Sequence, residues 1–317
     1  MSLSPTMVNL FGWRHHEQHG QQAAQPAEQG GTTSAVYHEP PRKSHVHPRP
    51  PPSEEEQQKL TELEQFANEF RQQSPPKDVT YKPLEDTFFS DPGLYRRYLR
   101  ATRGDVKHAK RRLQDTIEWR RDFRPDCIPP DDVAAEATSG KQILTGYDRE
   151  ARPILYLRPG RENTKPSPRQ VRYLVWSLER GINLMPPGQE SLCIIVDFHG
   201  ASLATTPSLG TARQVANILQ NHYVERLGRA FVCNTPKFVN AFFTALSPFL
   251  DPITKDKIRF NDPEMTRFID PAQLDAQFGG QYRYAFDFQT YWESLVKHCG
   301  IKPDGMREPP EAQKQAS

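Results

Sequence analysis

Residues 192–198 read Leu-Cys-Ile-Ile-Val-Asp-Phe, and the stretch is apolar throughout its centre. A short apolar run without alternating polar residues is typical of a strand buried on both faces of a sheet. Helices are expected around residues 208–221 and 237–247, with a second apolar run at 230–233 between them. Strands that alternate with helices at this spacing predict an α/β fold, a mixed or parallel sheet covered by helices.

The sequence before this strand predicts a hairpin and a long helix. Two short apolar runs, 143–147 and 154–157, flank the turn segment 148–153, which favours an antiparallel hairpin. Residues 167–185 carry an apolar stripe at helical spacing, which is typical of an amphipathic helix. The hairpin and the helix extend the α/β pattern toward the N-terminus.

Residues 53–124 predict a small helical unit. Ser53 and Glu56 form a capping box, so a helix is expected to begin directly after Ser53. A further helix is expected over residues 94–101, and Asp105 is placed to cap the helix that follows it. Apolar residues repeat at helical spacing in each of these segments, which indicates a shared helical core.

Residues 1–52 are rich in Gln, His, Gly and Pro. This composition predicts a disordered tail, because it cannot bury enough apolar surface to offset the entropy of ordering. The proline run at 48–52 is a candidate ligand for a proline-motif-binding protein of the SH3 or WW type. The tail holds six histidines, which leave open a metal-binding tract beside the default of a solvated tail. They are His15, His16, His19, His38, His45 and His47.

The overall composition excludes several function classes. The 317 residues carry 41 Lys and Arg against 39 Asp and Glu, so net charge gives no argument for nucleic acid binding. The four cysteines form no C-x-x-C pair, and none lies near a His at metal-ligand spacing, so free thiols and no metal site are expected. No stretch reaches 18 apolar residues, and no signal peptide is evident. The sequence therefore predicts a cytoplasmic protein.

Two neighbouring segments carry candidate chemistry. A helix over residues 237–247 would be apolar on nearly all sides but too short to span a bilayer. It is either a buried core helix or a helix that lines a lipid cavity, and Phe242 and Phe243 would point in different directions from it. Residues 221–230 place an acid, two bases and a glycine before a buried strand, which indicates either a surface ion pair or a polar cluster at a pocket.

An enzyme is the less favoured interpretation. Residues 200–204 read Gly-Ala-Ser-Leu-Ala and resemble a hydrolase nucleophile elbow, but residues 205–207 intervene before any helix can start. No convincing triad partners follow, and no Gly-rich phosphate loop occurs. No catalytic residue is therefore expected.

Several of these motifs, taken in order, resemble the CRAL-TRIO lipid-binding fold. The likeness covers roughly residues 85–285 and is greatest to fungal phosphatidylinositol transfer proteins linked with pleiotropic drug resistance. It implies that residues 53–124 are the family's N-terminal helical unit, that residues 125–300 are the lipid-binding domain, and that residues 301–317 are a flexible tail. The motifs include Glu179-Arg180, the segment from Asn221 through Tyr223 and Glu225 to Arg229, and Pro248-Phe249-Leu250-Asp251-Pro252.

The resemblance also implies a phosphatidylinositol headgroup site made of Glu225, Thr254, Lys257 and Arg103. Glu225 would accept hydrogen bonds from inositol hydroxyls, while Lys257 and Arg103 would neutralise the phosphate. Thr102 departs from the founding members, which carry a basic residue there.

The same resemblance implies a gate helix over residues 237–247 that opens at a membrane. Ser202 matches a hydroxyl residue that holds phosphatidylcholine in founding members, but Ala204 replaces the second one, which argues against phosphatidylcholine as a ligand. The implied lipid-pocket and gate residues are Phe238, Phe242, Phe243, Leu246 and Ser202.

The implied function is transfer of one phosphatidylinositol between membranes, with transient contact at the membrane surface and no cofactor other than the lipid. Two alternatives remain open. One is a carrier of sterol, isoprenoid or haem on the same fold, and His199, His222 and Tyr223 are available as haem ligands. The other is a regulatory module for lipid kinases that transfers no lipid.

Overall fold

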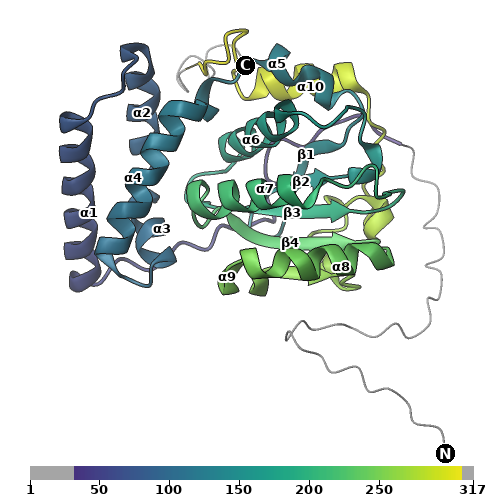
Figure 1. Ribbon diagram of the computed structural model, residues 1–317. Helices are drawn as coiled ribbons and strands as arrows, with labels where there is room; N and C mark the ends of the chain where they lie inside the picture. The colour runs from purple at the N-terminus through teal and green to yellow at the C-terminus, as the bar shows by residue number, and fades with distance from the viewer. Residues whose placement is uncertain (1–31, 309–317) are drawn as a thin grey trace, which may run out of the picture.

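A five-stranded mixed sheet lies at the centre of the computed structural model, which describes residues 32–308 (Figure 1). The strand order follows the chain, β1-β2-β3-β4-β5. β1 pairs antiparallel with β2 as the predicted hairpin, and the other neighbours are parallel. The α/β prediction is confirmed. The strands are β1 (Gln142–Tyr147), β2 (Pro153–Leu157), β3 (Leu192–Asp197), β4 (Leu227–Cys233) and β5 (Ile258–Phe260).

The strand register sorts side chains onto the two faces of the sheet. Leu155 pairs with Ile194, and Ile194 pairs with Ala230, so their side chains share one face. The neighbouring residues Ile195 and Phe231 lie on the opposite face and are fully buried. β3 is therefore buried from both sides, as its continuous apolar sequence predicts.

Helices α6 (Pro168–Asn183), α7 (Leu209–His222) and α8 (Lys237–Leu246) lie along the first face. The C-terminal part of the chain covers the second face, where the Phe231 and Phe268 rings lie 5.9 Å apart. The remaining elements of this domain are short or peripheral: η2 (Pro125–Cys127), α5 (Pro130–Ala137), η3 (Pro159–Arg161), η4 (Ser247–Phe249), α9 (Pro252–Asp256), η5 (Met265–Arg267), η6 (Ala276–Phe278) and α10 (Phe288–His298).

The predicted helical unit stands beside the sheet domain (Figure 1). Ser53 Oγ accepts from the backbone N–H of Glu56 at 3.1 Å, and Asp105 caps its helix in the same way. The unit has an apolar core of its own, which includes Leu63, Leu94 and Leu113. Its elements are α1 (Glu54–Gln73), η1 (Val79–Tyr81), α2 (Lys82–Phe89), α3 (Leu94–Ala101) and α4 (Val106–Phe123), of which α2 was not expected.

Residues 32–52 are not disordered, which corrects the prediction for this part of the 1–52 tail. The segment lies extended against the sheet domain: the Tyr37 carbonyl accepts from Gly146 N–H at 3.0 Å, and the Tyr147 hydroxyl donates to the His38 carbonyl at 2.5 Å. We call it the N-terminal strap. The strap gains its hydrogen-bond partners from the edge strand β1. The prediction of disorder used only the composition of residues 1–52, which contains no information about such distant partners. Residues 1–31, including the first three histidines of the tail, lie outside the described residues.

The predicted tail at 301–317 also begins later than expected. Ile301 is buried and pairs with Arg307 in an isolated bridge, so the described part to residue 308 is packed on the body. Residues 309–317 lie outside the described residues. Within residues 32–308, no helix is long and apolar enough to cross a membrane, and no group of three or more His, Cys, Asp or Glu is arranged to hold a metal ion.

Candidate functional site

Two adjoining cavities lie between the sheet and its helical cover. The apolar cavity, of about 370 Å³, lies between the first sheet face and helices α6, α7 and α8. The polar cavity, of about 750 Å³, lies at the amino-terminal ends of β3 and β4, beside α4 of the helical unit. Six residues line both, so the two cavities share a wall: Ile194, Ala216, Leu219, Leu227, Leu250 and Thr254. Together they offer one amphiphilic compartment.

α8 forms the outer wall of the apolar cavity. Phe242, Phe243 and Leu246 line it, as the resemblance implies. Phe243 also packs edge-on against Phe260 at 5.1 Å, whereas Phe242 packs with the α7 residues Ala212 and Ala216. The two phenylalanines thus point in different directions.

The opposite side of α8 faces outward. Asn240, Ala241, Thr244 and Ala245 are exposed, so the helix is not a core helix buried on every side. The sequence left open whether this segment is a buried core helix or a helix that lines a cavity. One lining face and one exposed face fit the second interpretation, a lid over a cavity.

Phe238 and Ser202 do not line either cavity. Phe238, in the first turn of α8, packs beside the small cluster of Phe198, Val232 and Val239. Ser202 lies in the exposed loop after β3, where its hydroxyl interacts with Thr205. Ala204 does line the apolar cavity, so the position that lacks the second hydroxyl is the one of the two that reaches this cavity.

The polar cavity brings all four implied headgroup residues together: Arg103, Glu225, Thr254 and Lys257. Lys257 Nζ lies 3.5 Å from Glu225 Oε2, so acceptor and cation are adjacent. Thr254 donates to Asp251, which caps α9. Arg103 and Glu225 both have positive φ angles, of 54° and 59°. Non-glycine residues adopt this conformation at a cost, and such strain is concentrated at functional sites.

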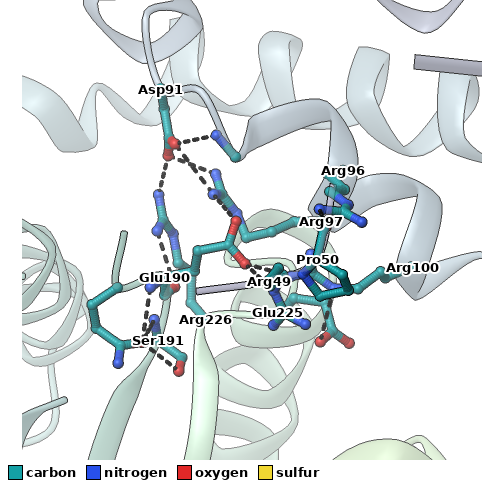
Figure 2. Close-up of polar contacts among 12 residues, drawn as sticks. Arg49, Pro50, Asp91, Arg96, Arg97, Arg100, Glu190, Ser191, Glu225 and Arg226 are labelled. Atoms are coloured by element: carbon teal, nitrogen blue, oxygen red, sulfur yellow. Dashed lines mark hydrogen bonds and ion pairs between the residues drawn. The ribbon is translucent and has the colours of Figure 1, made fainter. Parts of the chain in front are cut away.

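An ion-pair network behind the polar cavity joins the helical unit to the sheet domain (Figure 2). Arg100 of α3 donates to Glu190 at 2.8 Å, and its Nε lies 4.0 Å from Glu225 Oε2. Glu190 also accepts from Arg49 of the strap at 3.0 Å. Glu225 is therefore held between Arg100 and Lys257, with the strap and the helical unit fixed to the same network.

Asp91 anchors the other half of this network. It pairs with Arg97 at 2.7 Å and with Arg226 at 2.6 Å. Burial acts to raise the pKa of Asp91, but the two arginines outweigh burial and lower the pKa to about 2. Burial, followed by repulsion from Arg97, lowers the pKa of Arg226 to about 10, so both partners remain charged at neutral pH.

Residues 137–280 match the family model of the CRAL/TRIO domain. The chain contains a CRAL/TRIO domain. It is 48% identical over 212 residues to the CRAL-TRIO domain-containing protein C23B6.04c of Schizosaccharomyces pombe, covering 67% of this chain and 21% of that protein. It is 36% identical over 230 residues to the phosphatidylinositol transfer protein PDR17 of Saccharomyces cerevisiae, covering 68% of this chain and 65% of that protein. The matches thus span less than two thirds of either relative.

A solved structure described as the crystal structure of Sfh5 aligns with a TM-score of 0.56 at 17% identity, covering 77% of this chain and 92% of that chain. At this identity the likeness concerns the fold alone. The family resemblance inferred from the motifs is confirmed.

The residues considered as haem ligands are not brought together in the CRAL/TRIO domain. His199 follows the carboxyl end of β3, whereas His222 and Tyr223 precede the amino end of β4. Because β3 and β4 are parallel, these positions lie at opposite ends of the sheet. His222 stacks on Trp119 at 4.4 Å and the Tyr223 hydroxyl donates to Glu179 at 2.7 Å. Burial and nearby arginines lower the pKa of His222 to about 4.

The hydrolase elbow is also not formed. The segment after β3 does not turn directly into a helix, because α7 begins only at Leu209. Ser202 Oγ accepts from the Thr205 backbone N–H at 3.3 Å and lies 3.4 Å from Thr205 Oγ1. Ser202 is exposed, but it does not lie in the strand-to-helix turn that the elbow requires.

Sequence reasoning missed the residues that hold the CRAL/TRIO domain against the helical unit. Arg100 and Glu190 are 90 positions apart, and Asp91 and Arg226 are 135 apart. No local pattern selects these partners among 80 charged residues. The only local signal is Glu225-Arg226 itself, because it lies in the motif that carries the family resemblance.

Proposed function

We propose that the protein binds one phosphatidylinositol molecule and exchanges it between membranes. The observation that carries the proposal is the pair of adjoining cavities, one apolar and one lined by charged residues, with a shared wall. Such a compartment matches a molecule with acyl chains at one end and a polar headgroup at the other. The similarity to a phosphatidylinositol transfer protein of Saccharomyces cerevisiae supports this choice of lipid.

The polar cavity has suitable chemistry for an inositol phosphate. The Glu225 carboxylate can only accept hydrogen bonds, as inositol hydroxyls require. Lys257 and Arg103 supply the positive charge for the phosphodiester, and charge-assisted bonds of this kind are the strong ones. Thr254 belongs to both cavities and lies where headgroup and glycerol would meet.

The apolar cavity removes the acyl chains from water, which is worth about 0.8 kcal/mol for each methylene group. Full enclosure then requires a lid that opens at a membrane, and we assign this role to α8. Opening is a population shift that contact with the bilayer favours. The protein would therefore work in the cytoplasm with transient membrane contact. Exchange makes and breaks no covalent bond, so no catalytic residue is assigned.

The strap bears on the proposal that its proline run recruits a partner. The Pro50 carbonyl accepts from Arg96 at 2.8 Å, and Arg49 pairs with Glu190. A proline-binding domain would have to displace these contacts. Replacing Pro48, Pro51 and Pro52 with alanine separates the two roles without removing the strap, because the contacts of Arg49 and of the Pro50 carbonyl are kept. A carrier then retains phosphatidylinositol transfer, whereas a recruitment scaffold loses its cellular function.

The first test is to purify the protein from a eukaryotic host and identify the co-purifying lipids by mass spectrometry. Near-stoichiometric phosphatidylinositol is the expected result, followed by transfer of labelled phosphatidylinositol between vesicles. Glu225→Ala and Lys257→Ala should lose the bound lipid while retaining the fold. Sterol alone would overturn the choice of ligand, and a stable protein without lipid would favour a regulatory module.

A further inference from the structure

One wall of the polar cavity is built from a single face of α4. His108, Arg111 and Arg112 line the cavity, and their spacing of three and four residues places them on one side of the helix. Arg103, in the turn before α4, lies in the same wall. This wall is at the helical unit, whereas Glu225 and Lys257 belong to the CRAL/TRIO domain.

Two of these arginines have no partner in the part of the chain that the structure describes. Within residues 32–308, neither Arg103 nor Arg111 forms a side-chain hydrogen bond or an ion pair, and both side chains are exposed to the cavity. Arg112 donates to the Gln220 carbonyl, a neutral group, so its charge is not neutralised there. The wall therefore holds three guanidinium groups that no carboxylate balances by direct contact.

The acidic groups of the cavity are mostly engaged elsewhere. Glu225 is shared between Lys257 and Arg100, and Asp251 accepts from Thr254 as the cap of α9. Asp115, one turn after Arg111 on α4, is the remaining carboxylate on the cavity wall, and it weakens the positive potential without pairing with an arginine. The arginines outnumber it at this wall.

We propose that the α4 wall binds a second phosphate, so that phosphatidylinositols phosphorylated on the inositol ring are also ligands of this cavity. The inference rests on the proposed function. The single phosphodiester of phosphatidylinositol is accounted for by Lys257 and Arg103. This leaves Arg111 without a partner within the described residues and Arg112 bonded only to the neutral Gln220 carbonyl. The planar fork of arginine suits phosphate oxygens, and a cavity of about 750 Å³ extends beyond the headgroup residues to this wall.

The test compares short-chain, soluble phosphatidylinositol with its ring-monophosphorylated form by calorimetry, without membranes. Arg111→Gln should weaken binding of the phosphorylated ligand about tenfold, the loss expected for one charge-assisted contact, and should leave phosphatidylinositol affinity unchanged. Lys107→Gln is the matched control, because it removes one positive charge from the same helix outside the cavity lining. Equal effects on both ligands, or no effect on either, would overturn the second phosphate site.

A second arm separates a headgroup site from general attraction to anionic membranes. Association of the same variants is measured with phosphatidylcholine vesicles with and without phosphatidylserine. The proposal expects Arg111→Gln and Lys107→Gln to behave alike here. If Arg111→Gln changes only vesicle association, the wall contacts the membrane surface and the proposal is wrong. If the unmodified protein binds neither soluble ligand, the proposed function itself fails, and this inference fails with it.

Discussion

At the scale of single residues, Glu225 combines a strained backbone with a shared charge. Its φ of 59° is a conformation that glycine adopts freely and that costs other residues about 1 kcal/mol. Its carboxylate lies between Lys257 and Arg100. Glycine would relieve this strain but would remove the carboxylate, so the two roles of the position can be separated by substitution.

Substitution of Glu225 can separate these two roles. Glu225→Ala and Glu225→Gly should both lose phosphatidylinositol affinity by about tenfold or more, because both remove the hydrogen-bond acceptor. In urea denaturation, the free energy of unfolding of Glu225→Gly should be about 1 kcal/mol larger than that of Glu225→Ala, because glycine relieves the positive φ. Glu69→Ala should change neither property, because it removes an exposed carboxylate of α1 that has no ion pair within the described residues. Equal stability of the two Glu225 variants would contradict the strain.

The low pKa of Asp91 predicts how the stability of the protein depends on pH in acid. Its folded-state pKa of about 2 lies below the ordinary value of 3.8, so its contribution is complete above pH 3.8 and is lost as the pH falls toward 2. The shift corresponds to about 2 kcal/mol of unfolding free energy. Asp91→Asn should be less stable at neutral pH and should lose less stability between pH 4 and pH 2 than the unsubstituted protein. If the free energies of unfolding of the two proteins fall in parallel between pH 4 and pH 2, Asp91 is not the group that causes the loss of stability in acid.

At the scale of elements, α8 and the segment after it line the two adjoining cavities from the outer side. η4 carries Phe249, whose side chain is 42% exposed at the mouth of the polar cavity and lies under Arg213 at 4.1 Å. An exposed aromatic ring beside a lid is suitable for contact with lipid headgroups. The proposed lid and the proposed membrane contact are thus adjacent along the chain.

Phe249→Ser should slow phosphatidylinositol transfer between vesicles several-fold, because it removes an apolar group from the proposed membrane contact. Binding of soluble short-chain phosphatidylinositol should stay within twofold of the original value, since no membrane is involved in that assay. Val79→Ser is the control: Val79 is 79% exposed in the helical unit and lines neither cavity. A similar loss of transfer in both variants would argue against a specific contact at Phe249.

At the scale of the whole molecule, the strap and the ion-pair network join two cores into one body. The strap contacts β1 through Tyr37 and His38, and then reaches Glu190 through Arg49. His38 is buried against His298, and its Nε2 has no hydrogen-bond partner within the described residues. A neutral imidazole tolerates this position, whereas a charged one does not.

The strap should therefore loosen in mild acid. Burial, and then repulsion from His298, lowers the pKa of His38 to about 4, so the unfolded chain binds more protons than the folded protein between pH 6.5 and pH 4. Stability should fall across this window by roughly 3 kcal/mol from His38. His222 contributes in the same window. The protection factors of strap amides against hydrogen exchange, which are corrected for the intrinsic pH dependence of exchange, should fall from pH 7 to pH 5. His38→Asn should flatten that fall, and an unchanged fall would exclude His38.

The sequence predicted elements better than it predicted contacts between them. The helix over 94–101 matches its prediction because apolar spacing and start signals are local. α2 was missed, because its eight residues give too short a periodicity to recognise. The strap was missed because a polar, proline-rich segment gains its hydrogen bonds from β1, more than 100 positions away.

In the candidate site, too, local motifs were recognised from the sequence, whereas the directions of side chains set by the tertiary structure were not. Its four headgroup residues were assigned through family motifs, and the structure brings them into one cavity. Phe238 and Ser202 were assigned to the lipid pocket but face elsewhere, since helix phase and loop geometry decide their direction. Arg111 was not considered, because an arginine on an amphipathic helix has the same local pattern whether it faces water or a cavity.

The fixed polarity of the compartment constrains the path of any cargo. The polar cavity lies at the amino-terminal ends of β3 and β4, and the apolar cavity lies under α8. If the compartment carries a lipid as proposed, this polarity admits the lipid in one orientation only, with its headgroup toward β3 and β4 and its chains under α8. The carrier would then have to present the same side to donor and acceptor bilayers, and each lipid would leave one leaflet before it enters the next.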